Sequence, residues 1–291
     1  MTCGLSATPA NANPKIFVES DWLAAHSADP NVVILHVGRD RSTYDSGHIP
    51  NARFLPFAEI AATRDGIPNQ LPPAEQLKAA FEKVGVGDKI QVVLYSDRIG
   101  VYAARAYFAL DYLGHGSRTV LLNGGLEKWK SESRPISKEE PKPAPALLTV
   151  RPHPKLIVDR RQVQRMLKDP HVVLIDARPP DEYSGAQLSD GAPRAGHIPG
   201  ARNVFWVDNL ESVQNPVLKP MSEIQKKYEQ AGVGRGKRVI VYCRAGVQAS
   251  HDYLTLKMLG YKSVIYDGSF FEWSNAKDTA VETSGSMGKQ P

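Results

Sequence analysis

Cys243 is the residue of this chain whose surroundings best suit covalent chemistry. It directly follows the apolar run 239–242, and the turn-prone stretch 244–247 separates it from a helical pattern over 249–259. A cysteine between a strand end and a helix start lies where backbone N–H groups converge and where the helix dipole is positive, and both favour the thiolate. A buried structural cysteine is the usual interpretation of a cysteine beside an apolar run, but such a residue needs no glycine-containing loop. The pattern therefore predicts that Cys243 is a nucleophile.

The residues around this thiol predict a binding site for an anion. Backbone N–H groups of the following loop would surround the bound group, and that loop consists of Arg244, Ala245, Gly246, Val247 and Gln248. Arg244 is the first candidate for the positive charge because it is adjacent to the cysteine. Arg178 is the second, because it follows a predicted strand whose carboxyl end should face the same crevice; a structural ion pair with a carboxylate is the equally weighted alternative. Arg194, in a longer loop of the same half, is the third.

The composition is that of a soluble globular protein with room for two domains. The chain has 291 residues, of which 42% are hydrophobic and 23% charged, and it lacks the long apolar run of a membrane span. Its net charge of +5 comes from dispersed Lys and Arg, without the aromatic-interleaved basic motif of a nucleic-acid-binding protein. We therefore expect no nucleic-acid partner and no membrane partner, and a positive field of this size suits small anions.

The two cysteines and the start of the chain limit the other possibilities. Cys3 and Cys243 are too few for a disulfide framework or a zinc site, so we expect no metal and no cofactor. Residues 1–15 are small and polar, and we expect a disordered tail there rather than an intact signal peptide. The expected location is cytoplasmic, or periplasmic if an upstream signal segment was removed.

The same order of sequence landmarks occurs twice along the chain. Each half has a β-branched run, a Gly-His-Ile-Pro segment, a second apolar run and a late segment that ends in tryptophan. The matching segments are 32–39 with 172–178, 47–53 with 196–202, 92–95 with 239–242, and 124–129 with 268–273. The repetition predicts a tandem duplication of one domain.

Each repeat alternates short apolar runs with amphipathic stretches. Strands are expected at 32–37, 91–95, 119–122, 172–176, 238–242 and 263–266, and helices at 20–26, 75–83, 101–113, 160–168, 221–231 and 249–259. Such alternation predicts the α/β class, with a mostly parallel sheet flanked by helices on both faces in each domain. The expected domains are 16–135 and 157–285, joined by the Pro- and charge-rich linker 136–156.

The two repeats differ around the nucleophile. Ser96 takes the place of Cys243 in the first repeat, and the loop after it is one residue longer. The second repeat has about ten extra residues between Arg178 and His197 compared with Arg39 to His48, which is enough for an added loop beside the cysteine. We therefore expect the second domain to be catalytic and the first to be non-catalytic.

Several other side chains are expected to be structural. Asp176 should anchor loops through hydrogen bonds, and His48 and His197 should organise the turns in which they occur, because both repeats have one. Gly246 should serve the backbone conformation of the loop. His251 is expected on an exposed face of its helix. Trp129 and Trp273 are expected in the core.

These features together resemble the tandem two-domain form of the rhodanese family of sulfurtransferases, over residues 16–285. The resemblance rests on the paired Gly-His-Ile-Pro segments, on Asp176-Ala177-Arg178, on the loop from Cys243 to Val247, and on Asp267-Gly268 with Trp273. In such proteins the first domain is typically inactive, and the cysteine of the second carries sulfur as a persulfide. The resemblance implies a small anionic sulfur donor such as thiosulfate, which releases sulfite, and a cyanide or thiol acceptor. It is compatible with a monomer, which we expect.

The loop favours one branch of that family and leaves others open. Cys-Arg-x-Gly-Val resembles thiosulfate sulfurtransferases, whereas mercaptopyruvate sulfurtransferases usually have Cys-Gly-Ser/Thr-Gly-Val. Gln248 and Ala245 depart from the family, which commonly has Thr or Arg at the first position and in some members Lys at the second. Two alternatives are a 3-mercaptopyruvate sulfurtransferase and a persulfide carrier that serves a protein partner. A cysteine-dependent phosphatase is disfavoured, because Ala249 stands where that chemistry requires arginine.

Overall fold

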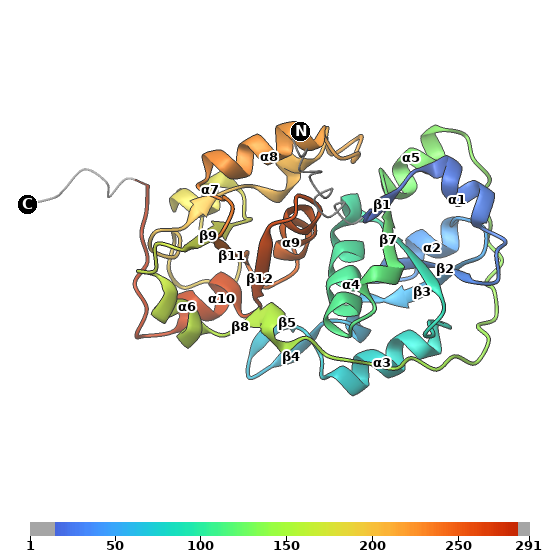
Figure 1. Ribbon diagram of the computed structural model, residues 1–291, viewed down its shortest axis with the longest axis horizontal. Helices are drawn as coiled ribbons and strands as arrows, with labels where there is room; N and C mark the ends of the chain where they lie inside the picture. Colours follow the sequence, from blue (N-terminus) through green and yellow to red (C-terminus); the bar gives the residue numbers. More distant parts are fainter. Residues whose placement is uncertain (1–14, 285–291) are drawn as a thin grey trace, which may run out of the picture.

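The computed structural model describes residues 15–284, so Cys3 and nearly all of the expected tail lie outside the described residues. Two α/β domains follow one another along the chain, with the first on the right of Figure 1 and the second on the left. The expected fold class is confirmed in both. Among the described residues, no helix is both long and apolar enough to cross a bilayer.

The first domain has a five-stranded parallel sheet in the order β1-β7-β6-β2-β3. Its strands are β1 (Phe17–Val18), β2 (Val32–Gly38), β3 (Ala52–Pro56), β6 (Gln91–Ser96) and β7 (Thr119–Leu122). Its helices are α1 (Ser20–His26), α2 (Ser42–Ser46), α3 (Ala74–Lys83), α4 (Val101–Tyr112) and α5 (Gly125–Ser131). Alternate residues of the central strands face α3 and α4 on one side and α1 and α5 on the other.

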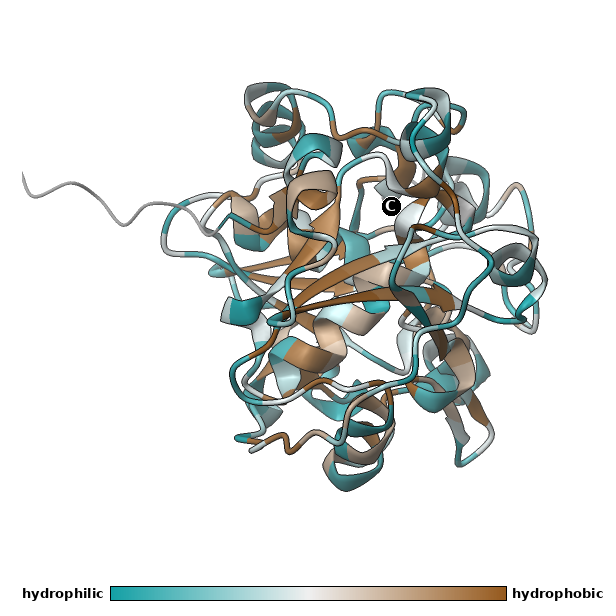
Figure 2. Cartoon of the chain, turned by 90° about the vertical axis from the view of Figure 1, so that its right-hand side faces the viewer, coloured by the Kyte–Doolittle hydropathy of each residue, from teal (hydrophilic) through white to brown (hydrophobic). Residues whose placement is uncertain are grey.

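The second domain repeats this plan in the order β10-β9-β11-β12-β8, again with all neighbours parallel. Its strands are β8 (Ile157–Val158), β9 (Val172–Asp176), β10 (Arg202–Asn203), β11 (Arg238–Tyr242) and β12 (Lys262–Tyr266). Its helices are α6 (Arg160–Met166), α7 (Pro180–Ser184), α8 (Met221–Gln230), α9 (Ala249–Met258) and α10 (Ser269–Asn275). Figure 2 shows the apolar strands inside and the polar residues concentrated on outer loops and helices.

The hydrogen-bond register corrects one detail of the repeat. His36 pairs with Tyr95 in the first sheet, and Asp176 pairs with Tyr242 in the second. His36 is therefore the counterpart of Asp176, and Gly38, not Arg39, is the counterpart of Arg178. The arginine of the first repeat is displaced by one residue, which reverses the side of the strand end to which it projects.

Helices α4 and α9 form the contact between the domains and lie side by side in the middle of Figure 1. Every residue of α4 from Val101 to Asp111 is buried, because its own sheet covers one side and α9 covers another. A helix that is apolar nearly all round is typical of such a position. The rings of Phe108 and Tyr253 meet edge to face at 4.9 Å in this contact. One hydrophobic core therefore continues from the first domain into the second.

A short hairpin that the sequence analysis missed also bridges the domains. Strands β4 (Ala62–Arg64) and β5 (Ile67–Gln70) pair antiparallel around Asp65-Gly66, whose φ angles are 51° and 76°. An Asp-Gly pair between two short runs is a known hairpin signal, so this element was predictable. After β5 the chain reaches the second domain, where the side chain of Gln70 donates to the carbonyl of Asp267 at 3.0 Å.

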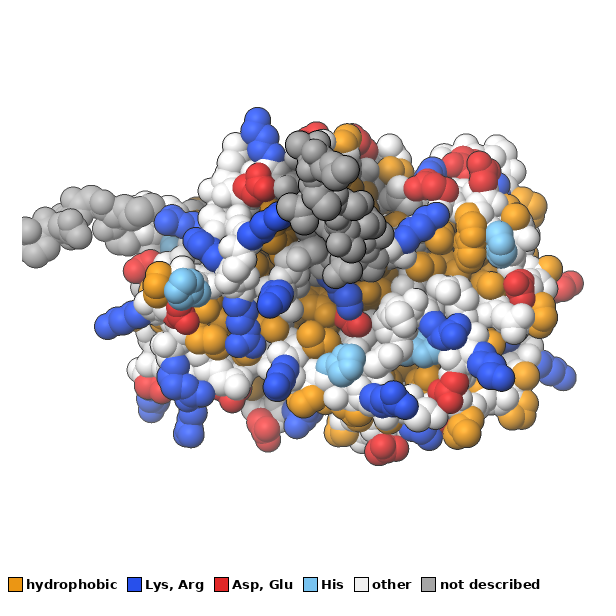
Figure 3. Space-filling view, viewed as in Figure 1, with side chains coloured by type: hydrophobic (Ala, Val, Ile, Leu, Met, Phe, Trp, Pro, Cys, Tyr) orange, Lys and Arg blue, Asp and Glu red, His pale blue; other side chains and the backbone are white. Residues whose placement is uncertain are grey.

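The segment between the domains has little regular structure. It runs along the outer edge of the first domain before reaching β8 (Figure 1). The side chain of Leu148 is fully buried, and its N–H donates to Glu82 at 2.8 Å. Figure 3 shows Lys and Arg scattered over the visible face, without a single basic block.

Phe108→Ala should lower the free energy of unfolding by about 3–5 kcal/mol, because it leaves a cavity in the core shared by both domains. Urea unfolding followed by circular dichroism measures the change. The matched control is Leu147→Ala, whose side chain is 70% exposed and whose loss should cost less than about 0.5 kcal/mol. Equal stability of the two variants would contradict a shared core.

Candidate active site

Cys243 lies at the junction of β11 and α9, as the sequence predicts. Its side chain is buried, and its N–H donates to Oγ of Ser269 at 3.2 Å. The same oxygen accepts the N–H of Gly246 at 3.0 Å, so Ser269 fixes both ends of the turn after the cysteine. Gly246 has a φ of 76°, and a Cβ there would lie 2.6 Å from a carboxylate oxygen of Asp267. The expected backbone role of this glycine is confirmed.

The surroundings of the Cys243 thiol shift its pKa in opposite directions. Complete burial raises the pKa of Cys243 above its ordinary value, and the nearby charge of Asp176 acts in the same direction. Backbone N–H groups of Ala249, Ala245 and Gln248 point to the sulfur and act to lower the pKa. Burial outweighs these donors, so the pKa of the Cys243 thiol lies above its ordinary value in this structure. The N–H groups are nevertheless placed to stabilise negative charge on sulfur.

The thiol opens into a pocket of about 550 Å³ between the two domains. Side chains from both domains form its wall. The first domain contributes Arg39, Asn69, Ile99, Val101 and Tyr102, and the second contributes Trp206, Val213, Cys243, Arg244, Ala245, Val247 and Gln248. The structure thus brings together the nucleophile and four of the predicted loop residues.

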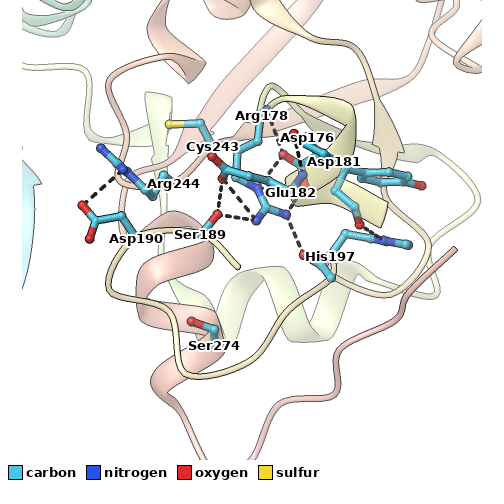
Figure 4. A network of polar contacts seen from close by, with 12 residues as sticks. Asp176, Arg178, Asp181, Glu182, Ser189, Asp190, His197, Cys243, Arg244 and Ser274 are labelled. Carbon is cyan, nitrogen blue, oxygen red and sulfur yellow. Dashed lines mark hydrogen bonds and ion pairs between the residues drawn. The ribbon is translucent and has the colours of Figure 1, made fainter. Parts of the chain in front are cut away.

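Arg244 is the predicted cation that lies in this pocket. Its side chain is 45% exposed and contacts a carboxylate oxygen of Asp190 at 3.3 Å. Because that pair is open to solvent, an incoming anion can compete for the guanidinium. Figure 4 shows Arg244 joined to Asp190 by a dashed line, apart from the cluster around Arg178.

Arg178 does not line the pocket, which corrects the expectation that it binds substrate. Its guanidinium is fully buried, with Nε donating to Asp176 at 3.0 Å and Nη1 to Oγ of Ser189 at 3.0 Å. It also lies 3.9 Å from the ring centre of Phe270. Figure 4 shows the sulfur of Cys243 pointing away from this guanidinium. The alternative of a structural ion pair is therefore the correct one, and Asp176 is the hydrogen-bond anchor that we expected.

Arg194 also lies outside the pocket and is a second correction. Its Nε donates to the carbonyl of Ser274, and Nη2 donates to the carbonyls of Trp273 and Ala276, each at 2.8 Å. These bonds tie the extra loop of the second domain to the end of α10 and to the residue that follows it. All hydrogen bonds of this side chain among the described residues are made with α10 and the residues after it, and none with the pocket of Cys243.

The histidines divide into two that behave as predicted and one that does not. The rings of His48 and His197 stack on Tyr44 and Tyr183 at 3.7 and 3.9 Å, which confirms their role in the turns. His251 is buried rather than exposed, because α9 is covered by its sheet and by the first domain. Burial lowers the pKa of His251 to about 4, so its ring is neutral.

The loop also has a buried ion pair to the first domain. Nη1 of Arg105, on α4, lies 2.8 Å from Oδ1 of Asp267, and both side chains are buried. Nη2 of Arg105 donates to the carbonyl of Asn69 at 2.7 Å, and the N–H of Leu71 donates to Oδ2 of Asp267 at 2.7 Å. Arg105 thereby connects the first domain to the residue that packs against Gly246.

The sequence analysis missed all of the wall that comes from the first domain. Ile99 belongs to the loop after Ser96, which is the counterpart of the cysteine loop, and it adopts a φ of 54°. The repeat itself held a usable signal, because a pseudosymmetric pair of domains that pack through α4 and α9 places these two loops together. Trp206 and Val213 had no local sequence signal.

Comparison with known proteins agrees with this architecture. A sequence profile for the rhodanese-like domain matches residues 19–132 and 159–276. The sulfur carrier protein TtuD of Thermus thermophilus is 34% identical over 278 residues, covering 91% of this chain and 95% of that protein. A thiosulfate sulfurtransferase of Azotobacter vinelandii is 32% identical over 272 residues, covering 93% and 98%.

Solved structures show the same fold at lower identity. The wild-type structure of EanB superposes with a TM-score of 0.84 at 23% identity, covering 94% of this chain and 70% of that one. The anaerobic ergothioneine biosynthesis enzyme of Chlorobium limicola, in complex with trimethyl histidine, has a TM-score of 0.83 at 24% identity, covering 92% and 70%. At these identities the likeness is one of fold.

Arg178→Ala should lower the free energy of unfolding by about 3–5 kcal/mol, because it leaves the buried carboxylate of Asp176 without its partner. Arg244→Ala removes only a solvent-exposed pair and should cost less than about 1 kcal/mol. Urea unfolding compares the two variants. A stable Arg178→Ala protein with a raised KM for its sulfur donor would instead place Arg178 in contact with substrate.

Alkylation of Cys243 by iodoacetamide should have a pH midpoint above that of a free cysteine, about 8.5, because burial raises the pKa of the thiol. The thiolate fraction at pH 7 is then smaller than that of a free cysteine, and the rate rises only at alkaline pH. Mass spectrometry of the Cys243 peptide gives the rate separately from that of Cys3. A midpoint below that of N-acetylcysteine would mean that the backbone donors outweigh burial.

Proposed function

The chain belongs to the rhodanese family, and on that premise we propose that it moves the outer sulfur of thiosulfate to a cyanide or thiol acceptor through a persulfide on Cys243. The observation that carries the proposal is the convergence of three backbone N–H groups on a thiol in a pocket that also holds Arg244. The loop sequence Cys-Arg-x-Gly-Val and the similarity to a thiosulfate sulfurtransferase support thiosulfate as the donor.

The first half of the reaction forms the persulfide. The Cys243 thiolate attacks the outer sulfur of thiosulfate, a new S–S bond forms, and the S–S bond of the donor breaks with its electron pair leaving on sulfite. The donors from Ala245, Gln248 and Ala249 stabilise the negative charge on the cysteine sulfur and then on the persulfide. Among the described residues, no carboxylate or imidazole lines the pocket, so the thiol proton leaves to solvent.

The second half returns the cysteine to its starting state. The acceptor attacks the outer sulfur of the persulfide, the Cys243–sulfur bond breaks, and the thiolate leaves. Cyanide becomes thiocyanate, and a thiol becomes a persulfide of that thiol. The two steps balance without an external oxidant or reductant.

A persulfide carrier for a protein partner is the second candidate function. The similarity to the sulfur carrier protein TtuD supports it. The size of the pocket supports it as well, because about 550 Å³ exceeds what a small dianion fills. Its donor step is the same, and only the acceptor differs. 3-Mercaptopyruvate stays the alternative donor, which Arg244 disfavours.

Incubation with thiosulfate should add the mass of one sulfur atom to the wild type and none to Cys243→Ser, measured on the intact protein. Cys3→Ser is the matched control and should gain the sulfur as the wild type does. Steady-state production of thiocyanate should then be lost in Cys243→Ser alone. Sulfur loading with negligible thiocyanate turnover would favour the carrier. Loading by 3-mercaptopyruvate alone would reassign the donor, and loading by neither would overturn the proposal.

A further inference from the structure

Arg39 is a cation in the sulfur pocket that comes from the domain without the thiol. It follows β2 directly, its side chain is exposed, and it lines the same pocket as Cys243 and Arg244. Its guanidinium carbon lies 5.2 Å from the ring centre of Phe57 and 5.6 Å from that of Tyr102. These two faces hold the planar group at the pocket wall.

Arg39 differs from Arg178, Arg194 and Arg244 in the partners of its guanidinium group. Arg178 is paired with Asp176, Arg194 is bound by backbone carbonyls, and Arg244 contacts Asp190. Within residues 15–284, by contrast, no carboxylate forms an ion pair with Arg39. Its contacts are with aromatic rings, which leave the N–H groups of the guanidinium available.

Comparison of the two repeats explains why the side chain of Arg39 is exposed whereas that of Arg178 is buried in the core. In the second domain Asp176 draws the arginine two residues later into the core. Its counterpart in the first domain is His36, which is buried without a hydrogen-bond partner on either ring nitrogen. Gly38 stands where Arg178 stands, and the arginine follows one residue later. The first strand end therefore has no buried carboxylate to neutralise Arg39.

We propose that Arg39 is a substrate-binding residue that makes the pocket selective for sulfur donors with two negative charges. The proposal rests on the function proposed above and names a determinant of its donor choice. Arg39 and Arg244 reach the same pocket from different domains, and in this proposal the dianion binds between them. The apolar wall of Ile99, Val101 and Trp206 strengthens the attraction because it excludes water from part of the site. A guanidinium also presents paired N–H donors that match the oxygens of a sulfonate group.

Loss of Arg39 should therefore affect donors according to their charge. Thiosulfate is a dianion, whereas methanethiosulfonate is a monoanion that delivers the same kind of outer sulfur and releases a sulfinate. For Arg39→Gln, the second-order rate constant of persulfide formation with thiosulfate should fall about 10- to 100-fold, the effect of one charge-assisted hydrogen bond. With methanethiosulfonate it should fall less than about threefold, because one cation suffices. Arg39→Lys should recover part of the loss.

The control variant, Arg235→Gln, changes the net charge of the protein as Arg39→Gln does, but at a position outside the pocket. Arg235 is exposed, lies at the start of the loop before β11, and does not line the pocket. Arg235→Gln should leave both rate constants within about twofold of the wild type. Urea unfolding should give the same midpoint for the Arg39 and Arg235 variants, which separates a binding effect from a folding effect. An equal loss with both donors in Arg39→Gln, or no loss with either, would overturn the proposal.

A binding measurement separates this inference from the proposed function. Sulfate is a dianion that cannot donate sulfur, and it should protect Cys243 of the wild type from iodoacetamide. In Arg39→Gln, the sulfate concentration that gives the same protection should be about tenfold higher. This readout does not require persulfide formation. If the wild type forms no persulfide but Arg39 governs protection by sulfate, the proposed reaction fails and the anion site stands. If persulfide forms and protection is identical in the two proteins, the reaction stands and the role of Arg39 fails.

Discussion

The buried ion pair between Arg105 and Asp267 is the interaction on which the site depends. Removing two charges from water is costly, and the carbonyl of Asn69 and the N–H of Leu71 offset part of that cost with hydrogen bonds. Asp267 packs against Gly246, and Ser269 two residues later holds the N–H groups of the cysteine loop. The ion pair therefore fixes the distance between the nucleophile and the wall that the first domain supplies.

Burial raises the pKa of the Cys243 thiol, while three backbone N–H groups are placed to stabilise negative charge on its sulfur. Low exposure of Cys243 protects it from adventitious oxidation, and the same burial raises the pKa of its thiol. In the proposed reaction, preorganised N–H groups need no rearrangement when the persulfide forms, so they favour its negative charge over the resting thiol. Stabilisation of negative charge at this sulfur therefore comes from the backbone of the loop, while burial opposes it.

Local sequence patterns predicted the two parallel sheets, the tandem repeat and the position of Cys243, because these depend on runs of neighbouring residues. The predicted roles of the arginines were wrong where the position of the side chain depends on partners far along the chain. Arg194 binds carbonyls about eighty residues away, and Arg39 reaches the pocket only after two domains dock. His251 was placed on an exposed face because its own helix gives no sign of the first domain that covers it. The Asp65-Gly66 hairpin was also missed, although an Asp-Gly pair between two short runs is a local signal.

Ile99, Val101 and Tyr102 of the first domain line the pocket of Cys243. The domain duplication therefore affects the shape of the site as well as the stability of the protein. In a single-copy ancestor, every substitution near the pocket would also disturb the strand, loop and helix that hold the nucleophile. Here the copy that lacks the thiol can change the shape and charge of the pocket while the cysteine loop stays intact. Under the proposed function, substrate choice and bond-breaking would be inherited on separate segments of one gene, and donor preference could change while the nucleophile is kept.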